Sequence, residues 1–383
     1  MNANWHYPTA MRVGVGRIAE IAEVCALHKI TAPLLVTDPG VAALPMVRNV
    51  VDICTAAGLG IQVFSDIKPN PTGANVERGI AVYKKGKHDG VIAFGGGSGI
   101  DAGKAIAVAA EQQCSMWDLE DIGDNWLRAE ASKIPPIIAV PTTAGTGSEV
   151  GRAAVIVNQQ QHRKVIIFHP RMSPDCVILD PELTIGLPAQ LTAATGMDAL
   201  SHSLEAFCSP LFHPMAEGIA IEGIRLVKEY LPIAVANGSN IAARTQMLAA
   251  SSMGATAFQK GLGAMHALAH PLGARYDAHH GTLNAVLMPY VLIANRDVIK
   301  QPITRLGRYL DIGSGFEPFL DWVLELRESI NIPNTLQDIG IDDNRLDEIG
   351  EMAVADPSAA TNPIDHNADT YAKIAANAVH GRL

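Results

Sequence analysis

Acidic and imidazole side chains recur at helical spacing in the C-terminal half of the chain. Asp198 and His202 are four residues apart, and His266 and His270 repeat that spacing. Residues four apart on a helix project from one face, so each pair directs both of its side chains the same way. With a histidine pair and a glutamate nearby, these residues are candidate ligands of a shared metal ion: Asp198, His202, Glu205, His266, His270, His279 and His280.

The surroundings of these residues favour a shared cation. Most of them fall in apolar, alanine-rich stretches, where burying several polar groups without partners is costly. A single buried histidine is more commonly a satisfied core residue, but that interpretation weakens for the whole group. A carboxylate and imidazoles without a thiolate suit Fe(II), Zn(II), Mn(II) or Co(II) and argue against a structural zinc site. Spacing alone does not choose the ligands, although His266 and His270 form the simplest pair.

A glycine run in the N-terminal half predicts a phosphate site. Residues 90–94 (GVIAF) have the pattern of a buried strand, which leads into GGGSG at 95–99 and then into helix-like sequence. Without side chains, such a turn lets an anion approach the backbone, and the following helix N-terminus favours negative charge. The run departs from the dinucleotide fingerprint GxGxxG, because Ile100 stands where its third glycine would be. A tight turn that packs helix on strand is the alternative.

Two further loops strengthen the case for a nucleotide. Asp38 follows the first clear strand, where a carboxylate can accept from the ribose hydroxyls of NAD and would repel the extra phosphate of NADP. A helix cap is the alternative role for Asp38. The loop at 141–149 (PTTAGTGSE) also follows a strand directly, and it offers hydroxyls and free backbone amides to a polar ligand.

The elements that must position these residues differ between the two halves. In the first, β-rich runs at 33–37, 60–64, 90–94 and 136–140 alternate with helix-like stretches at 43–57 and 75–85, which predicts βαβ units and a parallel sheet. Beyond residues 183–188 helical spacing dominates, as at 192–207, 216–230, 241–258 and 316–327. We therefore expect an α/β dinucleotide-binding domain over residues 1–185 and an all-helical domain over residues 186–383.

Composition narrows the function classes. The net charge is -10, from 29 basic and 39 acidic residues, so nucleic-acid binding is not expected. No apolar run reaches the roughly 18 residues of a membrane span, and the N-terminus has no secretory pattern. The 5 cysteines are scattered without a CxxC pair, which is typical of reduced thiols. A cytoplasmic protein without a membrane partner is the expectation.

Together these motifs resemble the iron-containing (group III) alcohol dehydrogenase family, which has the dehydroquinate synthase-like fold. The resemblance runs along almost the whole chain, through PNPT at 69–72, GGGS at 95–98 and PTTAGTGSE at 141–149. Its most specific blocks are GMDA at 196–199 and GLGAMH at 261–266 with HPLG at 270–273. The family pattern implies an N-terminal dinucleotide-binding α/β domain and an all-α C-terminal domain.

The resemblance also implies roles for individual residues. It implies that the metal ligands are Asp198, His202, His266 and His280, and that His270 lies beside the substrate as the catalytic residue. It implies NAD contacts from Asp38, Asn70, Gly96, Gly97, Ser98, Thr142, Thr143, Thr146 and Lys164. The metal implied is Fe(II), with Zn(II) as the second choice, and the chain is expected to form a homo-oligomer, a dimer or larger.

The function expected is hydride transfer between NAD(H) and a short primary alcohol or aldehyde, an activity of the EC 1.1.1 class. A zinc-dependent glycerol or polyol dehydrogenase is a close alternative. A lyase similar to dehydroquinate synthase would need several basic residues for a phosphorylated, carboxylated substrate, and only a few, such as Lys260 and Arg275, lie near the histidines in the sequence. The third hypothesis is a non-catalytic protein that binds a metal or a nucleotide.

Overall fold

The computed structural model describes residue 7, residues 9–161 and residues 163–383, which form two compact units. The first, the sheet unit, contains Tyr7–Thr143 and Gly147–Gly186. The second, the helical unit, contains Leu187–Leu383 together with the short segment Ala144–Thr146. Each unit is described separately below.

The sheet unit is built on a 6-stranded sheet in which every paired strand runs parallel to its neighbour. The strand order is β1-β8-β5-β4-β2-β3. The strands are β1 (Ala10–Val13), β2 (Pro33–Val36), β3 (Gln62–Phe64), β4 (Gly90–Gly95), β5 (Ile137–Pro141) and β8 (Cys176–Leu179). The predicted parallel sheet is therefore confirmed, although the sequence interpretation singled out neither β1 nor β8.

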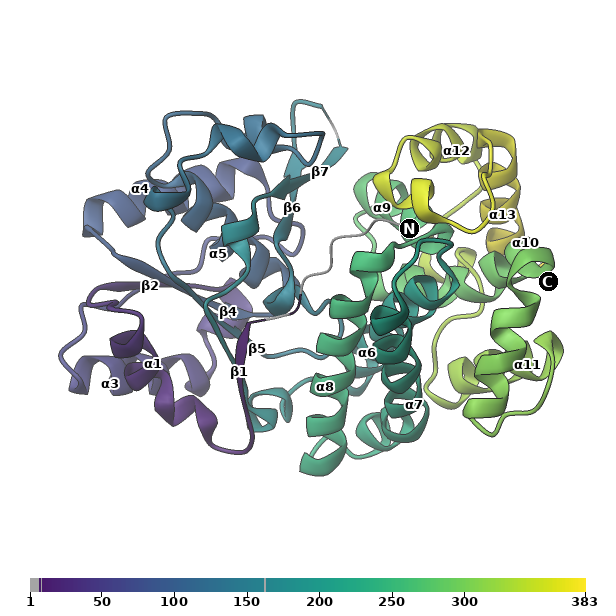
Figure 1. Ribbon diagram of the computed structural model, residues 1–383, viewed down its shortest axis with the longest axis horizontal. Coiled ribbons are helices and arrows are strands. Elements are labelled where there is room, and N and C mark those ends of the chain that lie inside the picture. Colours follow the sequence, from purple (N-terminus) through teal and green to yellow (C-terminus); the bar gives the residue numbers. More distant parts are fainter. Residues whose placement is uncertain (1–6, 8, 162) are drawn as a thin grey trace. The chain divides into compact units, whose positions relative to one another are not determined.

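Helices cover both faces of this sheet (Figure 1). On one face lie α1 (Ile21–Leu27) and α3 (Pro45–Ala56), and on the other lie α4 (Gly73–Gly86) and α5 (Gly97–Ala109), while α2 (Pro39–Ala42) is a single turn after β2. Side chains alternate along β4 accordingly, so that Ile92 and Phe94 join the core formed with α1 and α3. On the α5 face a Cβ on Gly103 would lie only 2.7 Å from the Cβ of Ala93, so helix and strand pack closely.

A second, antiparallel pair of strands completes the sheet unit. Strand β6 (Ala153–Asn158) pairs with β7 (Arg163–Phe168), and β6 alternates between buried and half-buried side chains. The backbone N–H of Val157 donates to the Pro71 carbonyl at 2.8 Å, which ties this hairpin to the turn before α4. That turn is rigid, because Thr72 and Asn75 form a reciprocal capping box at the start of the helix.

The helical unit contains eight α-helices among its described residues. They are α6 (Ala189–Cys208), α7 (Pro214–Ala236), α8 (Ile241–Ala257), α9 (Ala264–Tyr276), α10 (His280–Tyr309), α11 (Phe316–Ser329), α12 (Leu346–Val354) and α13 (Ala368–His380). Helix α6 is the centre of the unit, because it packs against α7, α8 and α10 and is buried from Thr192 to Phe207. The all-helical character predicted for this half is confirmed.

Proline lies inside several of these helices. Helix α7 continues through Pro232, α9 through Pro271, and α10 through both Pro289 and Pro302. Proline removes one backbone donor and disfavours a helix interior by roughly 3 kcal/mol. The sequence pattern ended one of these helices at Tyr230, whereas the structure extends α7 to Ala236, because tertiary packing outweighs local propensity.

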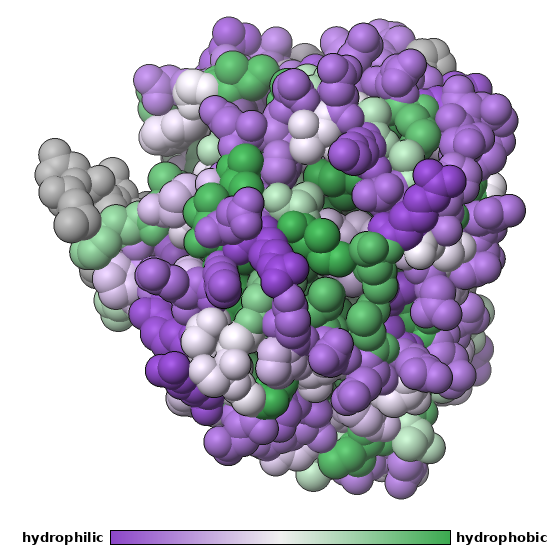
Figure 2. Space-filling model, turned by 90° about the vertical axis from the view of Figure 1, so that its right-hand side faces the viewer, coloured by the Kyte–Doolittle hydropathy of each residue, from purple (hydrophilic) through white to green (hydrophobic). Residues whose placement is uncertain are grey.

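The surface is mostly polar. Figure 2 shows a largely hydrophilic face, with hydrophobic residues gathered in a hollow near its middle. Scattered apolar side chains are exposed elsewhere on the described surface, as is ordinary for folded proteins. Among the described residues, no helix combines the length and the apolar character needed to cross a membrane.

Candidate metal centre and cofactor loops

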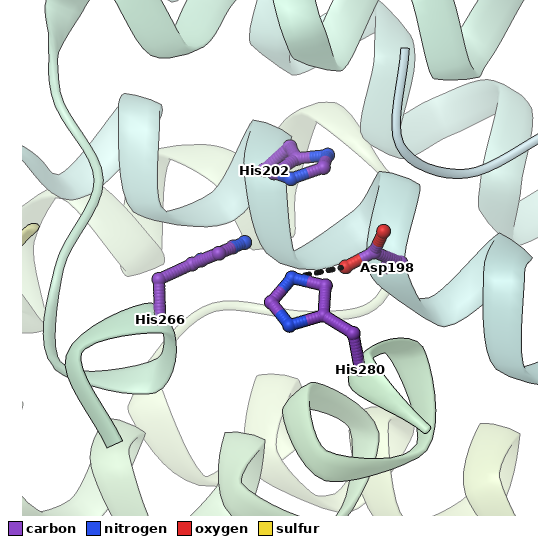
Figure 3. A group of neighbouring side chains, drawn as sticks. All are labelled: Asp198, His202, His266 and His280. Atoms are coloured by element: carbon purple, nitrogen blue, oxygen red, sulfur yellow. Dashed lines mark ion pairs between the residues drawn. The ribbon is translucent and has the colours of Figure 1, made fainter. Parts of the chain in front are cut away.

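Four side chains of the helical unit converge on one point (Figure 3). Asp198 and His202 come from α6, His266 from α9 and His280 from the first residue of α10. One potential ligand atom from each residue lies within 4.8 Å of those of the others, and the first three residues are buried. The Nε2 atom of His280 is 3.6 Å from Oδ1 of Asp198. Asp198, His202, His266 and His280 are also the four that the resemblance implied.

Close helix packing produces this convergence. Gly254 brings α8 against α6, because a Cβ there would lie 3.1 Å from the Cβ of His202 and 3.0 Å from the Ala199 carbonyl oxygen. The His202 and His266 rings stack, with centroids 4.8 Å apart and planes 19° apart. The His280 ring lies 5.2 Å from that of His266. Three imidazoles therefore surround one carboxylate in a tightly packed interior.

The protonation states of two of these histidines follow from their surroundings. Burial lowers the pKa of His202 to about 4, so its imidazole is neutral near pH 7. Burial also disfavours a charged His266, but the adjacent Glu205 carboxylate outweighs it, and the pKa of His266 is raised. A buried cation would compensate both carboxylates.

Two polar residues support the cluster without belonging to it. Glu205 lies two turns after Asp198 on α6, and its Oε2 is 2.6 Å from Nδ1 of His266. The Nδ2 atom of Asn284, one turn into α10, donates to Oδ1 of Asp198 at 2.8 Å and lies 3.2 Å from Nε2 of both His266 and His280. Among the described side chains, Oδ1 of Asn284 is buried without a hydrogen-bond partner.

The remaining candidate ligands take other positions. His270 lies one turn after His266 on α9, and its ring stacks on that of His280 with centroids 5.4 Å apart. Its Nδ1 is 2.7 Å from Oδ2 of Asp356, a residue just before the short helix Pro357–Thr361. His279 caps the N-terminus of α10, where its Nδ1 accepts from the Thr282 backbone at 3.4 Å. The pair His266 and His270, suggested by spacing alone, is therefore not the pair that the structure brings into the cluster.

The predicted cofactor residues of the sheet unit gather where three neighbouring strands end. Asp38 follows β2, Gly96 to Ser98 follow β4, and Thr142 follows β5. Because β2, β4 and β5 are adjacent and parallel, their carboxyl ends share one edge of the sheet, where nucleotides bind in folds of this kind. The Thr142 backbone donates to the Gly95 carbonyl at 2.9 Å, and a Cβ on Gly96 would touch Thr143 at 3.4 Å.

Local geometry explains the glycines of this edge. Gly95 has φ of 127°, a conformation that side chains rarely adopt. A Cβ on Gly99 would lie 2.7 Å from the Phe94 carbonyl oxygen, so the first turn of α5 has no room for a side chain at position 99. The Ser98 hydroxyl donates to the Pro69 carbonyl, which joins the glycine turn to the segment that carries Asn70. The result is a half-buried helix N-terminus beside several backbone amides, an arrangement that suits an anion.

Three predicted cofactor residues also belong to other local structures. Asp38 caps α2, because its Oδ1 accepts from the Val41 backbone at 3.0 Å, as the alternative interpretation proposed. Lys164 lies opposite Val157 in the hairpin that contacts the turn beside Asn70. Thr146 belongs to the segment that packs with the helical unit.

Comparison with known proteins gives the family. The sequence models of two families match the chain, "Iron-containing alcohol dehydrogenase" over residues 8–181 and "Fe-containing alcohol dehydrogenase family, C-terminal" over residues 192–379. The chain belongs to the iron-containing alcohol dehydrogenase family. It is thus an oxidoreductase of the alcohol dehydrogenase type, and its family membership implies a divalent metal.

Relatives match almost the whole chain. A "4-hydroxybutyrate dehydrogenase" of Cupriavidus necator is 38% identical over 96% of this chain and 98% of its own length. A "1,3-propanediol dehydrogenase" of Klebsiella pneumoniae is 37% identical over 96% of both chains.

Solved structures agree with this assignment. The structure of a 1,3-propanediol oxidoreductase superposes with a TM-score of 0.92 at 36% identity, covering 99% of this chain and 100% of the other. A sulfoacetaldehyde reductase from Bifidobacterium kashiwanohense, solved with NAD+, superposes with a TM-score of 0.89 at 28% identity and 99% coverage of both chains.

The sequence analysis did not identify several polar residues that make buried or half-buried contacts in the structure. Lys104 on α5 is fully buried, and its Nζ donates to the Ser148 carbonyl at 2.9 Å and lies 3.1 Å from Oδ1 of Asp101. Asp101 also accepts from the Val155 backbone at 2.8 Å. Their signal was the spacing of Asp101 and Lys104, an acid and a lysine three residues apart in an otherwise apolar helix. Asp356 gave no such local signal.

Proposed function

We propose that the chain is an NAD-dependent dehydrogenase of short primary alcohols and diols, with a divalent cation held by Asp198, His202, His266 and His280. The observation that carries the proposal is the convergence of one buried carboxylate and three imidazoles, with one potential ligand atom from each within 4.8 Å of the others. Such a donor set suits Fe(II) first and Zn(II) second within this family. A cation there would supply Lewis-acid polarisation at the oxygen of the alcohol or aldehyde.

The chain's own residues provide binding and orientation. The loops after β2, β4 and β5 offer backbone amides and hydroxyls to the nucleotide, and Asp38 follows β2, where a carboxylate is expected to accept from a ribose hydroxyl in this fold. His270 is the proposed catalytic residue, because Asp356 occupies its Nδ1 and leaves Nε2 to exchange a proton with the substrate hydroxyl. The names of the relatives support short diols and hydroxy acids as substrates.

A lyase of the same fold is the second candidate, but the basic residues argue against it. A phosphorylated, carboxylated substrate requires uncompensated cations beside it. Lys260 is buried, with its Nζ 3.0 Å from Glu217, and Arg275 is ion-paired with Glu348. Both basic residues expected near the histidines are therefore already compensated. Net accumulation of NADH during turnover would exclude a reaction in which NAD is used only transiently.

The decisive experiment is metal reconstitution. The protein is stripped with a chelator and reloaded anaerobically with Fe(II) or Zn(II), and NADH formation from NAD is followed with ethanol, 1-propanol, 1,3-propanediol and 4-hydroxybutyrate. We expect metal-dependent NADH formation and a ranking of these substrates. Absence of NADH formation with every alcohol, and of NADH consumption with the matching aldehydes, would contradict the proposal.

Adjacent histidines offer a matched pair of variants. His280→Ala removes a member of the cluster, whereas His279→Ala removes the cap of α10, outside the cluster. We expect His280→Ala to lose bound metal and activity while it still binds NAD. His279→Ala should keep both and lose about 1 kcal/mol of stability. Full metal content in His280→Ala would contradict the assignment of this ligand.

A further inference from the structure

Each of the two histidines of α9 has a carboxylate from another part of the helical unit close to its Nδ1 atom. Nδ1 of His266 is 2.6 Å from Oε2 of Glu205 on α6. One turn later, Nδ1 of His270 is 2.7 Å from Oδ2 of Asp356. Because Nδ1 of each ring faces a carboxylate, each ring presents its Nε2 on the opposite side.

The hydrogen positions at His266 follow from its neighbours on both sides. Oε1 of Glu205 accepts from the Met265 backbone at 2.7 Å, and an ionised carboxylate only accepts, so Nδ1 of His266 carries a proton. On the other side of the ring, Nε2 faces Nδ2 of Asn284 at 3.2 Å. That amide nitrogen is a donor, since it also donates to Oδ1 of Asp198. The lone pair of His266 is therefore on Nε2, toward the cluster.

We propose that Glu205 is a positioning residue for metal binding, because it fixes His266 in the tautomer and ring orientation in which Nε2 can bind a cation. The inference rests on the proposed metal site and adds to it a residue outside the four proposed ligands. The pair is shielded from water, with His266 at 1% and Glu205 at 5% exposure. A carboxylate behind a ligand histidine orients the ring and raises its basicity, and losing such a partner typically lowers metal affinity by about 10- to 100-fold.

Glu205→Gln is the sharpest variant, because an amide cannot replace the carboxylate here. Glu205 accepts two hydrogens, one from the Met265 backbone and one from His266. Glutamine has one carbonyl oxygen and one NH2 group, and the backbone N–H requires the oxygen. The NH2 group would then face Nδ1 of His266 and move the imidazole proton to Nε2, the atom needed for the metal.

Two control variants separate this role from simple support of α9. Asp356→Asn changes the same kind of contact at His270, outside the four-residue cluster. Asn362→Ala removes the other side-chain acceptor at the start of α9, where Oδ1 of Asn362 accepts from the Ala264 backbone at 3.1 Å. It leaves the Glu205–His266 contact in place. If Glu205 served only to stabilise the helix N-terminus, Asn362→Ala would have a comparable effect on metal binding.

The test measures metal binding directly. Zn(II) affinity is determined by calorimetric titration of the stripped full-length protein and its variants, and the visible absorption of the Co(II)-loaded proteins reports ligand geometry. Circular dichroism verifies that each variant is folded. We expect Glu205→Gln to bind Zn(II) about 10- to 100-fold more weakly, with an altered Co(II) spectrum. Asp356→Asn and Asn362→Ala should remain within about three-fold of the parent protein, and Asp356→Asn should lower kcat more than it changes KM.

The outcomes are distinct. Parent-like Zn(II) affinity and Co(II) spectrum in Glu205→Gln would overturn the inference. So would an equal loss of affinity in Asn362→Ala, because it would show that Glu205 only stabilises the start of α9. Failure of the parent protein itself to bind Zn(II) or Co(II) would instead contradict the proposed metal site, which keeps the two failures apart.

Discussion

The main chain of Gly281 lies against that of Ala194, so closely that a Cβ on Gly281 would sit 2.9 Å from the Ala194 carbonyl carbon and closer still to its oxygen. Gly281 directly follows His280 in α10, and Ala194 lies one turn before Asp198 in α6. The same Cβ would also come within 3.3 Å of the Asp198 side chain. This contact between two helices therefore sets the separation of His280 and Asp198.

We expect Gly281→Ala to weaken metal binding by about ten-fold and to lower the free energy of unfolding by about 1–3 kcal/mol, because the added methyl group must push α10 away from α6. Zn(II) titration and urea unfolding measure the two effects. Gly218→Ala is the control, since that glycine is exposed on α7 with no atom near its Cβ position, and alanine there should stabilise the helix by about 0.5–1 kcal/mol. Equal metal affinity in Gly281→Ala and the parent would show that the contact does not set the geometry of the cluster.

Asp38 offers a test of cofactor preference that barely disturbs the fold. Its carboxylate caps α2, but glycine replaces a capping residue at a cost of only a few tenths of a kcal/mol. We expect Asp38→Gly to raise the ratio of kcat/KM with NADP to that with NAD by about ten-fold, because the charge that repels the additional phosphate is gone. An unchanged ratio, in steady-state assays with both cofactors, would reduce Asp38 to its capping role.

The ion pair between the buried Lys104 and the half-buried Asp101 should be important for the stability of the sheet unit. Replacing Lys104 by methionine leaves the Asp101 carboxylate without its cation and removes one of the donors to the Ser148 carbonyl. Breaking a fully buried pair costs about 3–5 kcal/mol, and we expect the lower end of that range here because Asp101 is half-buried and keeps other hydrogen bonds. Urea unfolding would measure this loss. Lys133→Met, which breaks an exposed pair with Glu130, should cost at most about 1 kcal/mol. Similar losses in the two variants would argue against a structural role for Lys104.

We expect Asp89 to make a pH-dependent contribution to the free energy of unfolding. Its carboxylate accepts from the Thr31 hydroxyl at 2.6 Å and from the Thr31 and Ala32 backbones at 2.9 and 2.8 Å. Burial raises the pKa of Asp89, but these hydrogen bonds, with that of the Thr31 hydroxyl first, outweigh burial and lower it overall. A lowered folded-state pKa contributes stability above the unfolded value of about 3.9 and loses it as the pH falls through the folded value. At pH 7, Asp89→Asn should cost about 1–2 kcal/mol.

That difference should shrink at acidic pH. Urea unfolding of the metal-free parent and variant over a pH series provides the measurement. A difference that stays constant down to the lowest pH at which the parent folds would rule out the ionised carboxylate as its source.

Local pattern predicted the elements whose side chains are uniformly buried or regularly spaced. The runs that became β2, β4 and β5 are buried throughout, and the apolar spacing of α6 and α8 was equally clear. Strand β1 gave little signal, because it is a four-residue edge strand of mixed polarity. Strand β8 has an apolar pattern, but an aspartate flanks it directly on each side.

The site shows the same division. Helical spacing placed Asp198 and His202 on one face, but the choice among four later histidines depended on how α9 and α10 pack, which spacing does not encode. Glu205 was considered as a ligand, whereas the structure pairs it with Nδ1 of His266. Asp356 escaped notice because its partner His270 is 86 residues away and the intervening sequence carries no local link between them.

The short segment Ala144–Thr146 has a consequence for dissecting the chain. It belongs to the helical unit, although the residues on either side of it belong to the sheet unit. Gly145 packs so closely on α6 that a Cβ there would lie 2.7 Å from both the Cβ and the carbonyl oxygen of Thr195. A fragment beginning at Leu187 would therefore lack part of its own interior beside the helix that carries Asp198 and His202. The two units are not separable modules, and a split or permuted gene would have to keep this tripeptide with the C-terminal half.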